Sequence, residues 1–310
     1  MSSKLSQKMT KKHKIIVVLG PTASGKTSLA VKLARDFNGE IISADSRQVY
    51  KYMDLGTGKD LFEYNIGKKR IKYHLIDVVN PNTSFDLSKW LKATNKAILD
   101  IINRGKLPII CGGTGLYISA LCEGYQLQAQ DQKKLQQIRT KLDKKTLPQL
   151  LTILEHADEN TFLKIDKKNQ RRIQRSLENI LLNNRPLNHN KHVNPDYQFL
   201  KLGIKLPKET LHQKIDQRMN SRFEEGMLKE IKLLRTKGVS WKRLQEFGLE
   251  YKWMSFYSQK KISLEELKEN LARDIKKFAK RQTTWFKRDK KIKWLDNYSK
   301  AKKLAQTFLK

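Results

Sequence analysis

The stretch that decides the fold is IIVVLGPTASGKT, residues 15–27. Its first five residues are apolar and predict a buried strand, and the next eight form a complete Gly-x-x-x-x-Gly-Lys-Thr phosphate loop. A helical pattern follows over residues 28–35. The glycines let the backbone wrap around a phosphate, while the loop N–H groups and the helix N-terminus point at the anion. The stretch therefore predicts a polyphosphate ligand, but it does not identify that ligand.

The side chains of this loop indicate how the anion is held. Lys26 supplies a positive charge, and the hydroxyl of Thr27 suits Mg²⁺, the one cofactor that we expect. The residues predicted to bind a diphosphate are Gly20, Thr22, Ala23, Ser24, Gly25, Lys26 and Thr27.

Short apolar runs alternate with helical patterns through the first third of the chain. The predicted strands are residues 15–19, 40–43, 74–79 and 107–111, and the predicted helices are residues 28–37 and 86–104. This alternation predicts an α/β fold of the P-loop NTPase type, a parallel sheet flanked by helices. Ligands bind at the carboxyl ends of such strands, so the segments 44–50, 80–81 and 112–117 should meet the phosphate loop at one rim.

Composition divides the chain into three regions. We predict a basic disordered tail at residues 1–13, a core of residues 14–123 and 187–310, and an all-helical insertion at residues 124–186. A fifth strand is predicted at residues 197–206. An apolar stripe from Leu211 to Leu234 then predicts one long helix, closed by Gly238, before a helical and basic C-terminal region.

The net charge of the chain indicates what kind of partner it binds. The sequence has 64 Lys and Arg against 31 Asp and Glu, a formal net charge of +33. Lysines are spread along the whole chain, which fits a generally Lys-rich proteome, but residues 271–310 hold 14 basic and three acidic residues interleaved with aromatics. Basic and aromatic residues together favour RNA, whose phosphates need neutralising and whose bases can stack.

Cysteine content and hydropathy bear on location. Cys111 and Cys122 give neither a disulfide framework nor zinc-ligand spacing, so a reducing cytoplasm is expected. No apolar run approaches the length of a membrane span, and no secretory segment is evident. We expect a monomeric cytoplasmic protein.

Three residues outside the loop are candidates for catalysis. Asp45 follows the second predicted strand, where it could accept a proton from a nucleophile, bind Mg²⁺ or cap a helix with Ser46. Thr114 lies in a glycine-rich turn, where it either approaches a ligand or simply shapes the turn. Arg218 lies beside the apolar stripe, which favours a surface role, and the alternative is a phosphate clamp.

Taken together, the motifs resemble those of the tRNA dimethylallyltransferases, also called tRNA isopentenyltransferases, over roughly residues 13–290. The similar stretches are the phosphate loop, DSRQVY at 45–50, GTGK at 56–59, HLID at 74–77, GGTGLY at 112–117, Asn169 with Arg172, Arg175, Leu177 and Glu178, Arg218, Gly226, Glu230, KRQ at 280–282 and TWF at 284–286. No zinc-finger extension follows, which resembles the bacterial members.

The resemblance implies a reaction. A dimethylallyl group would pass from dimethylallyl diphosphate to N6 of the adenosine 3′ to the anticodon, in tRNAs that read codons beginning with U, giving N6-isopentenyladenosine and diphosphate. Asp45, Arg218 and Thr114 would be catalytic, and Mg²⁺ would bridge the diphosphate to Thr27. The insertion and the C-terminal region would grip the anticodon stem-loop. The residues implied to bind tRNA are Asp45, Ser46, Gln48, Tyr50, Asn169, Arg172, Arg281, Gln282 and Trp285.

The chain departs from the family pattern at a few positions. Residues 247–251 read FGLEY, where the family often has Ile-Gly-Tyr-Lys/Arg-Glu. This chain has Lys208 where the family commonly has Arg, and Arg222 where the family commonly has Met. Two other functions remain open. A small-molecule kinase would explain the loop but not the basic C-terminus, and an RNA-binding nucleotide switch would leave Asp45 and Arg218 without a task.

Overall fold

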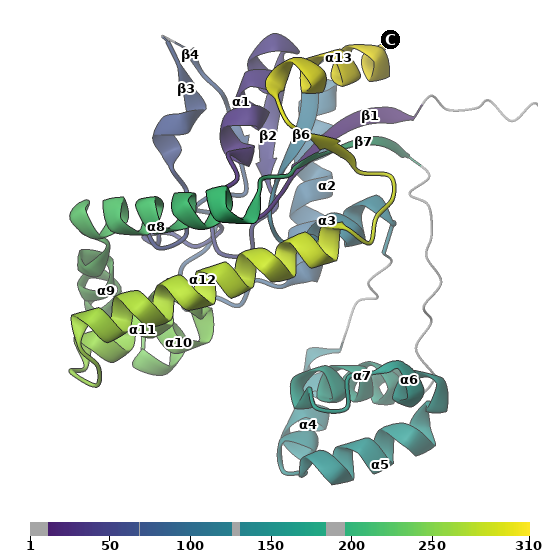
Figure 1. The fold of residues 1–310 in the computed structure, drawn as a ribbon. Coiled ribbons are helices and arrows are strands. Elements are labelled where there is room, and N and C mark those ends of the chain that lie inside the picture. Colours follow the sequence, from purple (N-terminus) through teal and green to yellow (C-terminus); the bar gives the residue numbers. More distant parts are fainter. Residues whose placement is uncertain (1–11, 68, 126–130, 184–195) are drawn as a thin grey trace, which may run out of the picture. The chain divides into compact units, whose positions relative to one another are not determined.

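The computed structural model describes residues 12–67, 69–125, 131–183 and 196–310 (Figure 1). It divides into two compact units, one of Met1–Gly124 and Val193–Lys310 and one of Tyr125–His192. Residues 1–11 of the predicted tail lie outside the described residues, and the first strand already begins at His13.

The first unit is built on a six-stranded sheet in which every pair of neighbours is parallel. The order is β5-β2-β6-β1-β7-β8. The strands are β1 (His13–Leu19), β2 (Gly39–Ser43), β5 (Tyr73–His74), β6 (Leu107–Gly112), β7 (Tyr197–Ile204) and β8 (Lys293–Leu295). The predicted parallel α/β sheet is thus confirmed, and the phosphate loop follows one of its two central strands.

Alternate side chains of β1 explain why helices cover both faces of the sheet. Ile15, Val17 and Leu19 pack with α2 (Leu87–Asn103) and α3 (Gly115–Cys122). Ile16 and Val18 face the other way, toward α1 (Lys26–Asp36) and α13 (Tyr298–Leu309). All five side chains are fully buried, as expected for a strand covered on both faces.

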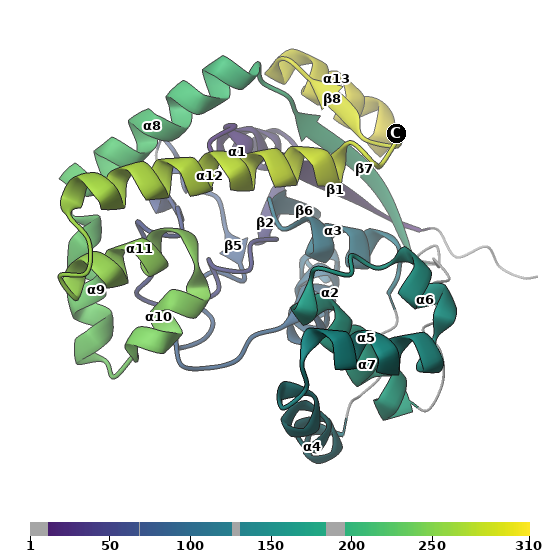
Figure 2. The same cartoon turned by 60° about the horizontal axis from the view of Figure 1, so that its bottom comes forward.

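A helical array continues the unit beyond the sheet. Figure 2 shows α8 and α12 as two long helices, with three shorter helices grouped near one end of them. These five helices share one apolar core with Val49, Tyr50 and Met53. Their bounds are α8 (Lys208–Glu224), α9 (Met227–Thr236), α10 (Trp241–Phe247), α11 (Leu249–Ser258) and α12 (Leu264–Phe286).

Two predicted elements differ from the structure, and one strand was not predicted. The strand predicted at 74–79 is wrong beyond His74, because Leu75 and Asp77 have φ of 61° and 57°, which ends the extended backbone. The single long helix after Leu211 is also wrong, since Gly226 with φ 93° separates α8 from α9. Strand β8 was not predicted. A short 3-10 turn, η1 (Leu61–Tyr64), and a hairpin, β3 (Asn65–Ile66) with β4 (Lys69–Arg70), complete the unit.

In its described residues, the second unit contains four helices around a small apolar core of leucine and isoleucine. Leu135, Ile138 and Leu142, which are spaced as on one face of a helix, lie within the first helix. The helices are α4 (Gln132–Asp143), α5 (Leu147–Ala157), α6 (Glu159–Lys164) and α7 (Gln170–Asn183). Across the described parts of both units, no helix combines the length and the apolar composition needed to cross a membrane.

Two strand ends lie unusually close beside the phosphate loop, and this leads to a stability prediction. A Cβ on Gly112, the last residue of β6, would lie 2.2 Å from the carbonyl oxygen of Ala44, directly after β2. The Cβ is fixed by the backbone of Gly112 and the oxygen belongs to the backbone of Ala44, so neither atom can rotate away. Gly112→Ala should therefore cost more than about 2 kcal/mol of unfolding free energy.

Gly105→Ala is the matched control, because a Cβ there meets nothing within 4 Å although φ is +67°. We expect it to cost about 1 kcal/mol, through backbone strain alone. Denaturant titration of both variants measures the difference, and equal losses would contradict the close-approach argument.

Candidate active site

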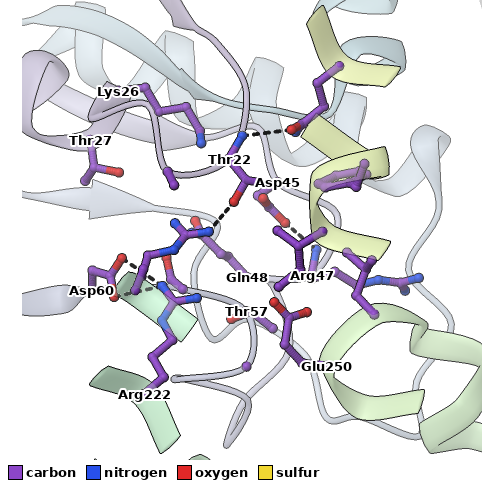
Figure 3. A pocket seen from close by; sticks show the side chains of 18 of the residues that line it. Thr22, Lys26, Thr27, Asp45, Arg47, Gln48, Thr57, Asp60, Arg222 and Glu250 are labelled. Carbon is purple, nitrogen blue, oxygen red and sulfur yellow. Dashed lines mark hydrogen bonds and ion pairs between the residues drawn. The ribbon is translucent and has the colours of Figure 1, made fainter. Parts of the chain in front are cut away.

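The carboxyl ends of β1, β2 and β6 open into a cavity of about 850 Å³ (Figure 3). Its wall combines the phosphate loop, the segments that follow β2 and β6, residues 56–63, one face of α8, residues 247–252 and one face of α12. Segment 80–81, predicted to reach this rim, is not part of the wall, because the chain turns away at Leu75 and Asp77. The site therefore joins three early strand loops with helices from the second half of the chain.

The phosphate loop ends at the N-terminus of α1, which begins at Lys26. Gly25 takes the left-handed conformation, with φ 85°, directly before α1. As at any helix N-terminus, the first N–H groups of α1 have no intrahelical partners and can meet an anion. Burial lowers the pKa of Lys26, and the positive charge of Arg218 lowers it further. A bound polyanion would relieve this concentration of positive charge.

Arg218 reaches the loop from α8, so the surface role favoured by its sequence context is wrong. Its guanidinium donates to the hydroxyl of Thr22 and lines the cavity. Burial, and then the neighbouring charge of Arg222, lowers the pKa of Arg218 to about 10. The side chain is placed as the predicted phosphate clamp would be.

Asp45 and Thr114 lie on the cavity wall in the segments that follow β2 and β6. One oxygen of Asp45 accepts the Arg47 N–H at 2.8 Å, so the carboxylate closes a turn while lying on the cavity wall. Thr114 accepts the Ser46 N–H at 3.1 Å, and its own N–H donates to Ala44 at 3.1 Å. Thr114 thus fixes the segment that carries Asp45 and also lines the cavity.

Further charged groups line the cavity, of which Lys214 and Glu250 were missed by the sequence reasoning. Lys214, Arg218 and Arg222 lie four residues apart on α8, a spacing that puts them on one helix face. Arg222, at a departure from the family pattern, is 5 % exposed and donates to both carboxylate oxygens of Asp60. Burial raises the pKa of Glu250, which also lies on the wall. The sequence shows the four-residue spacing of the basic residues, but it does not show that Asp60 pairs with Arg222.

The residues assigned to tRNA by resemblance have different positions. Ser46, Gln48 and Arg281 line the cavity, and Arg281 is exposed. Tyr50 does not line it, is 3 % exposed and packs edge-on against Phe247 at 4.9 Å. Direct contact of Tyr50 with RNA does not fit this burial, and its role here is to support the wall.

The remaining assignments lie away from the wall or are engaged inside it. Trp285 does not line the cavity and donates to the hydroxyl of Ser119 at 3.1 Å. Asn169 and Arg172 belong to the other unit, where the Asn169 side chain accepts the Arg172 N–H at 3.1 Å at the start of α7. Gln282 is 6 % exposed and bonds to the loop itself.

The oxygen groups beside Thr27 fit the expected Mg²⁺. Thr27, Asp60 and Glu63 all line the same cavity. One carboxylate oxygen of Glu63 is buried and has no hydrogen-bond partner among the described residues. No cluster of three or more His, Cys, Asp or Glu side chains suited to a metal occurs in the described part of the chain. A metal would therefore be held by Thr27 and by the ligand's own phosphate oxygens, with Glu63 nearby.

Comparison with known proteins agrees with this geometry. The sequence matches the IPP transferase family over residues 48–289 and the isopentenyl transferase family over residues 13–79. The chain belongs to the IPP transferase family. It is 41 % identical to tRNA dimethylallyltransferase 2 of Trichlorobacter lovleyi, over 91 % of this chain and 92 % of that one. It is 42 % identical to tRNA dimethylallyltransferase 2 of Treponema denticola, over 93 % and 97 %.

Solved structures of the family share the fold. The tRNA isopentenylpyrophosphate transferase of Staphylococcus epidermidis is 33 % identical, with a TM-score of 0.68 over 96 % of this chain and 99 % of that chain. A eukaryotic dimethylallyltransferase acting on tRNA is 26 % identical, with a TM-score of 0.67 over 88 % and 69 %. The resemblance seen in the sequence motifs is thus confirmed.

The exposed guanidinium at the cavity mouth gives a prediction about RNA. Arg281→Ala should weaken tRNA binding several-fold, because one phosphate or base contact is lost, and should leave the affinity for a diphosphate donor nearly unchanged. Filter binding over a salt series is the measurement. Affinity of the unaltered protein should fall steeply with salt, and the slope should be smaller by about one for the variant. An equal loss of donor affinity would place Arg281 in the donor site instead.

Proposed function

We propose that this protein transfers a dimethylallyl group from dimethylallyl diphosphate to N6 of the adenosine 3′ to the anticodon of tRNA. The observation that carries the proposal is one cavity in which the phosphate loop, Arg218 and the carboxylate of Asp45 face the same space. The names of the family's members, which describe tRNA dimethylallyltransferases, support the choice of substrates. We further propose that the tRNAs read codons beginning with U, and that the enzyme acts as a cytoplasmic monomer.

The donor's diphosphate fits the N-terminus of α1. There it meets the free N–H groups of the first turn and the side chain of Lys26, while Arg218 approaches from α8. Negative charge grows on the diphosphate as its bond to the allylic carbon breaks, and these fixed positive groups stabilise that charge. Mg²⁺, held by Thr27, would supply further neutralisation of the diphosphate.

The acceptor's chemistry fits Asp45. The N6 nitrogen of adenine forms a bond to the first carbon of the dimethylallyl group, the bond from that carbon to the diphosphate oxygen breaks, and N6 loses a proton. The Asp45 carboxylate accepts that proton and, by hydrogen bonding, orients the amine. An adenine inside an RNA stack cannot reach this cavity, so the base must be turned out of the stack.

The polar groups near the loop weigh against the two other functions. A kinase needs carboxylates that hold its metal at the nucleoside triphosphate, but Asp77, the nearest match in the sequence, is paired with Lys59 instead. In a binding protein without catalysis, Asp45 would serve only the turn that it closes with Arg47, and its place on the cavity wall would have no function.

A transfer assay tests the proposal. Incubation with labelled dimethylallyl diphosphate and bulk tRNA should put label into tRNA. The Asp45→Asn variant keeps the size and the hydrogen-bonding oxygen but lacks the base, so single-turnover transfer should fall by about 100-fold or more, with tRNA affinity little changed. ADP with a phosphorylated small molecule would instead support a kinase, and near-normal transfer by the variant would remove Asp45 from this role.

Ligand protection tests the choice of donor. With Mg²⁺ present, dimethylallyl diphosphate should raise the melting temperature, because it binds only the folded protein. ATP should raise it weakly, through its terminal phosphates. Lys26→Ala should abolish the protection by removing the charge that meets the diphosphate. Differential scanning fluorimetry at equal ligand concentrations measures all three. Stronger protection by ATP than by the prenyl donor would overturn the assignment.

A further inference from the structure

Gln282 is the polar member of an otherwise apolar stripe on α12. The buried residues of this helix face are Leu267, Leu271, Ile275, Ala279, Gln282 and Phe286. An amide at such a position costs free energy unless both of its ends are hydrogen-bonded. The partners of Gln282 therefore explain why it is there.

Both ends of the amide bind backbone in two different loops. The Gln282 oxygen accepts the Thr22 N–H of the phosphate loop at 2.8 Å, and its nitrogen donates to the Gly113 carbonyl after β6 at 2.9 Å. A Cβ on Gly113 would lie 2.2 Å from that nitrogen, so only glycine permits the contact. One side chain must offer an acceptor and a donor here, which an amide does and a carboxylate or an alkyl group does not.

These bonds occupy the backbone N–H of Thr22, so that group is not free to bind phosphate. Gln282 uses the N–H, while the hydroxyl accepts from Arg218 and keeps its own O–H to donate. Direct binding of the diphosphate by Thr22 therefore stays a prediction, restricted to the hydroxyl on the cavity wall. Thr22 also anchors the loop to α12 and α8, and the free N–H groups of the cradle lie further on, at the start of α1.

The neighbouring residue on α12 differs in exposure. Both Arg281 and Gln282 line the cavity, but Arg281 is exposed and Gln282 is 6 % exposed. The resemblance assigned both residues to tRNA. The geometry separates them, because the Gln282 amide is buried and both of its ends already bind backbone, whereas the Arg281 side chain is accessible to an RNA chain.

We propose that Gln282 is a positioning residue for the donor, which holds the phosphate loop in its anion-binding shape, and is not a contact for tRNA. The inference rests on the proposed use of the loop for a prenyl diphosphate. Two of its consequences are separate from that use. The Thr22 N–H must be protected from solvent by Gln282, and this protection must not depend on any ligand.

The first experiment needs no substrate. Hydrogen exchange of residues 20–27 is compared between the unaltered protein, Gln282→Leu, and Lys277→Ala as an exposed control on the same helix. Faster exchange in Gln282→Leu alone, with an unchanged circular dichroism spectrum, supports the hydrogen bonds that link Gln282 to Thr22 and Gly113. Unchanged exchange in that variant overturns the proposal, whatever the protein's substrates are.

The second experiment measures affinity for dimethylallyl diphosphate and for tRNA separately, by calorimetry with Mg²⁺. Gln282→Leu leaves the Thr22 N–H and the Gly113 carbonyl without partners, so donor binding should weaken by about 10-fold. The affinity of the Gln282→Leu variant for tRNA should change by less than about twofold, as for a substitution away from the RNA contact. Loss of tRNA affinity with normal donor affinity would overturn the proposal. Failure of the unaltered protein to bind the donor would instead refute the proposed function.

The pH dependence of donor affinity distinguishes loss of the two Gln282 hydrogen bonds from general damage to packing. In Gln282→Glu, a protonated carboxyl can accept from Thr22 and donate to Gly113 as the amide does, while the ionised form cannot. Beside a carbonyl, burial favours the protonated form. Donor affinity of this variant, relative to the unaltered protein, should therefore recover as pH falls from about 8 to about 5, and Gln282→Leu should show no recovery. The same pH dependence of donor affinity in both variants would contradict the role of these two hydrogen bonds.

Discussion

Parallel pairing of β1 with β6 on one side and β7 on the other is the constraint on which the site depends. It places the loops after β1 and β6 at the same edge of the sheet, and β2, paired with β6, adds the segment of Asp45. Gly112 and Ala44 then approach so closely that no side chain fits between them. The strand ends behind the site are therefore fixed by backbone contacts, and the side chains of Gln282 and Thr114 then hold the phosphate loop and the segment of Asp45.

The second half of the chain completes the cavity. Helix α8 brings Arg218 to Thr22, and α12 brings Gln282 to the same residue. Two helices thus converge on one position of the phosphate loop, at 196 and 260 residues' separation along the chain. Such long-range bonds form only when the whole unit has folded, so the anion site and the helical array depend on each other.

Some charges in and around the cavity are paired, and others are not. On the cavity wall Arg222 is neutralised by Asp60, and away from the wall Lys59 is neutralised by Asp54 and Asp77. Lys26 and Arg218 face each other, and burial lowers the pKa of both. The unpaired positive charge is concentrated where the donor's diphosphate would bind, which is the electrostatic preorganisation that a departing diphosphate requires.

The sequence by itself determined the parallel sheet, the phosphate loop and the family, because each rests on local patterns: an apolar run, two glycines, and motifs of contiguous residues. It could not place Arg218, whose position beside an apolar stripe also fits a surface role, nor decide whether Gln282 and Tyr50 face RNA or the interior. It missed the break at Gly226 and the turn after His74, where single residues with positive φ end an otherwise continuous pattern. Only the tertiary structure decided these points, because they depend on which distant backbone groups each side chain meets.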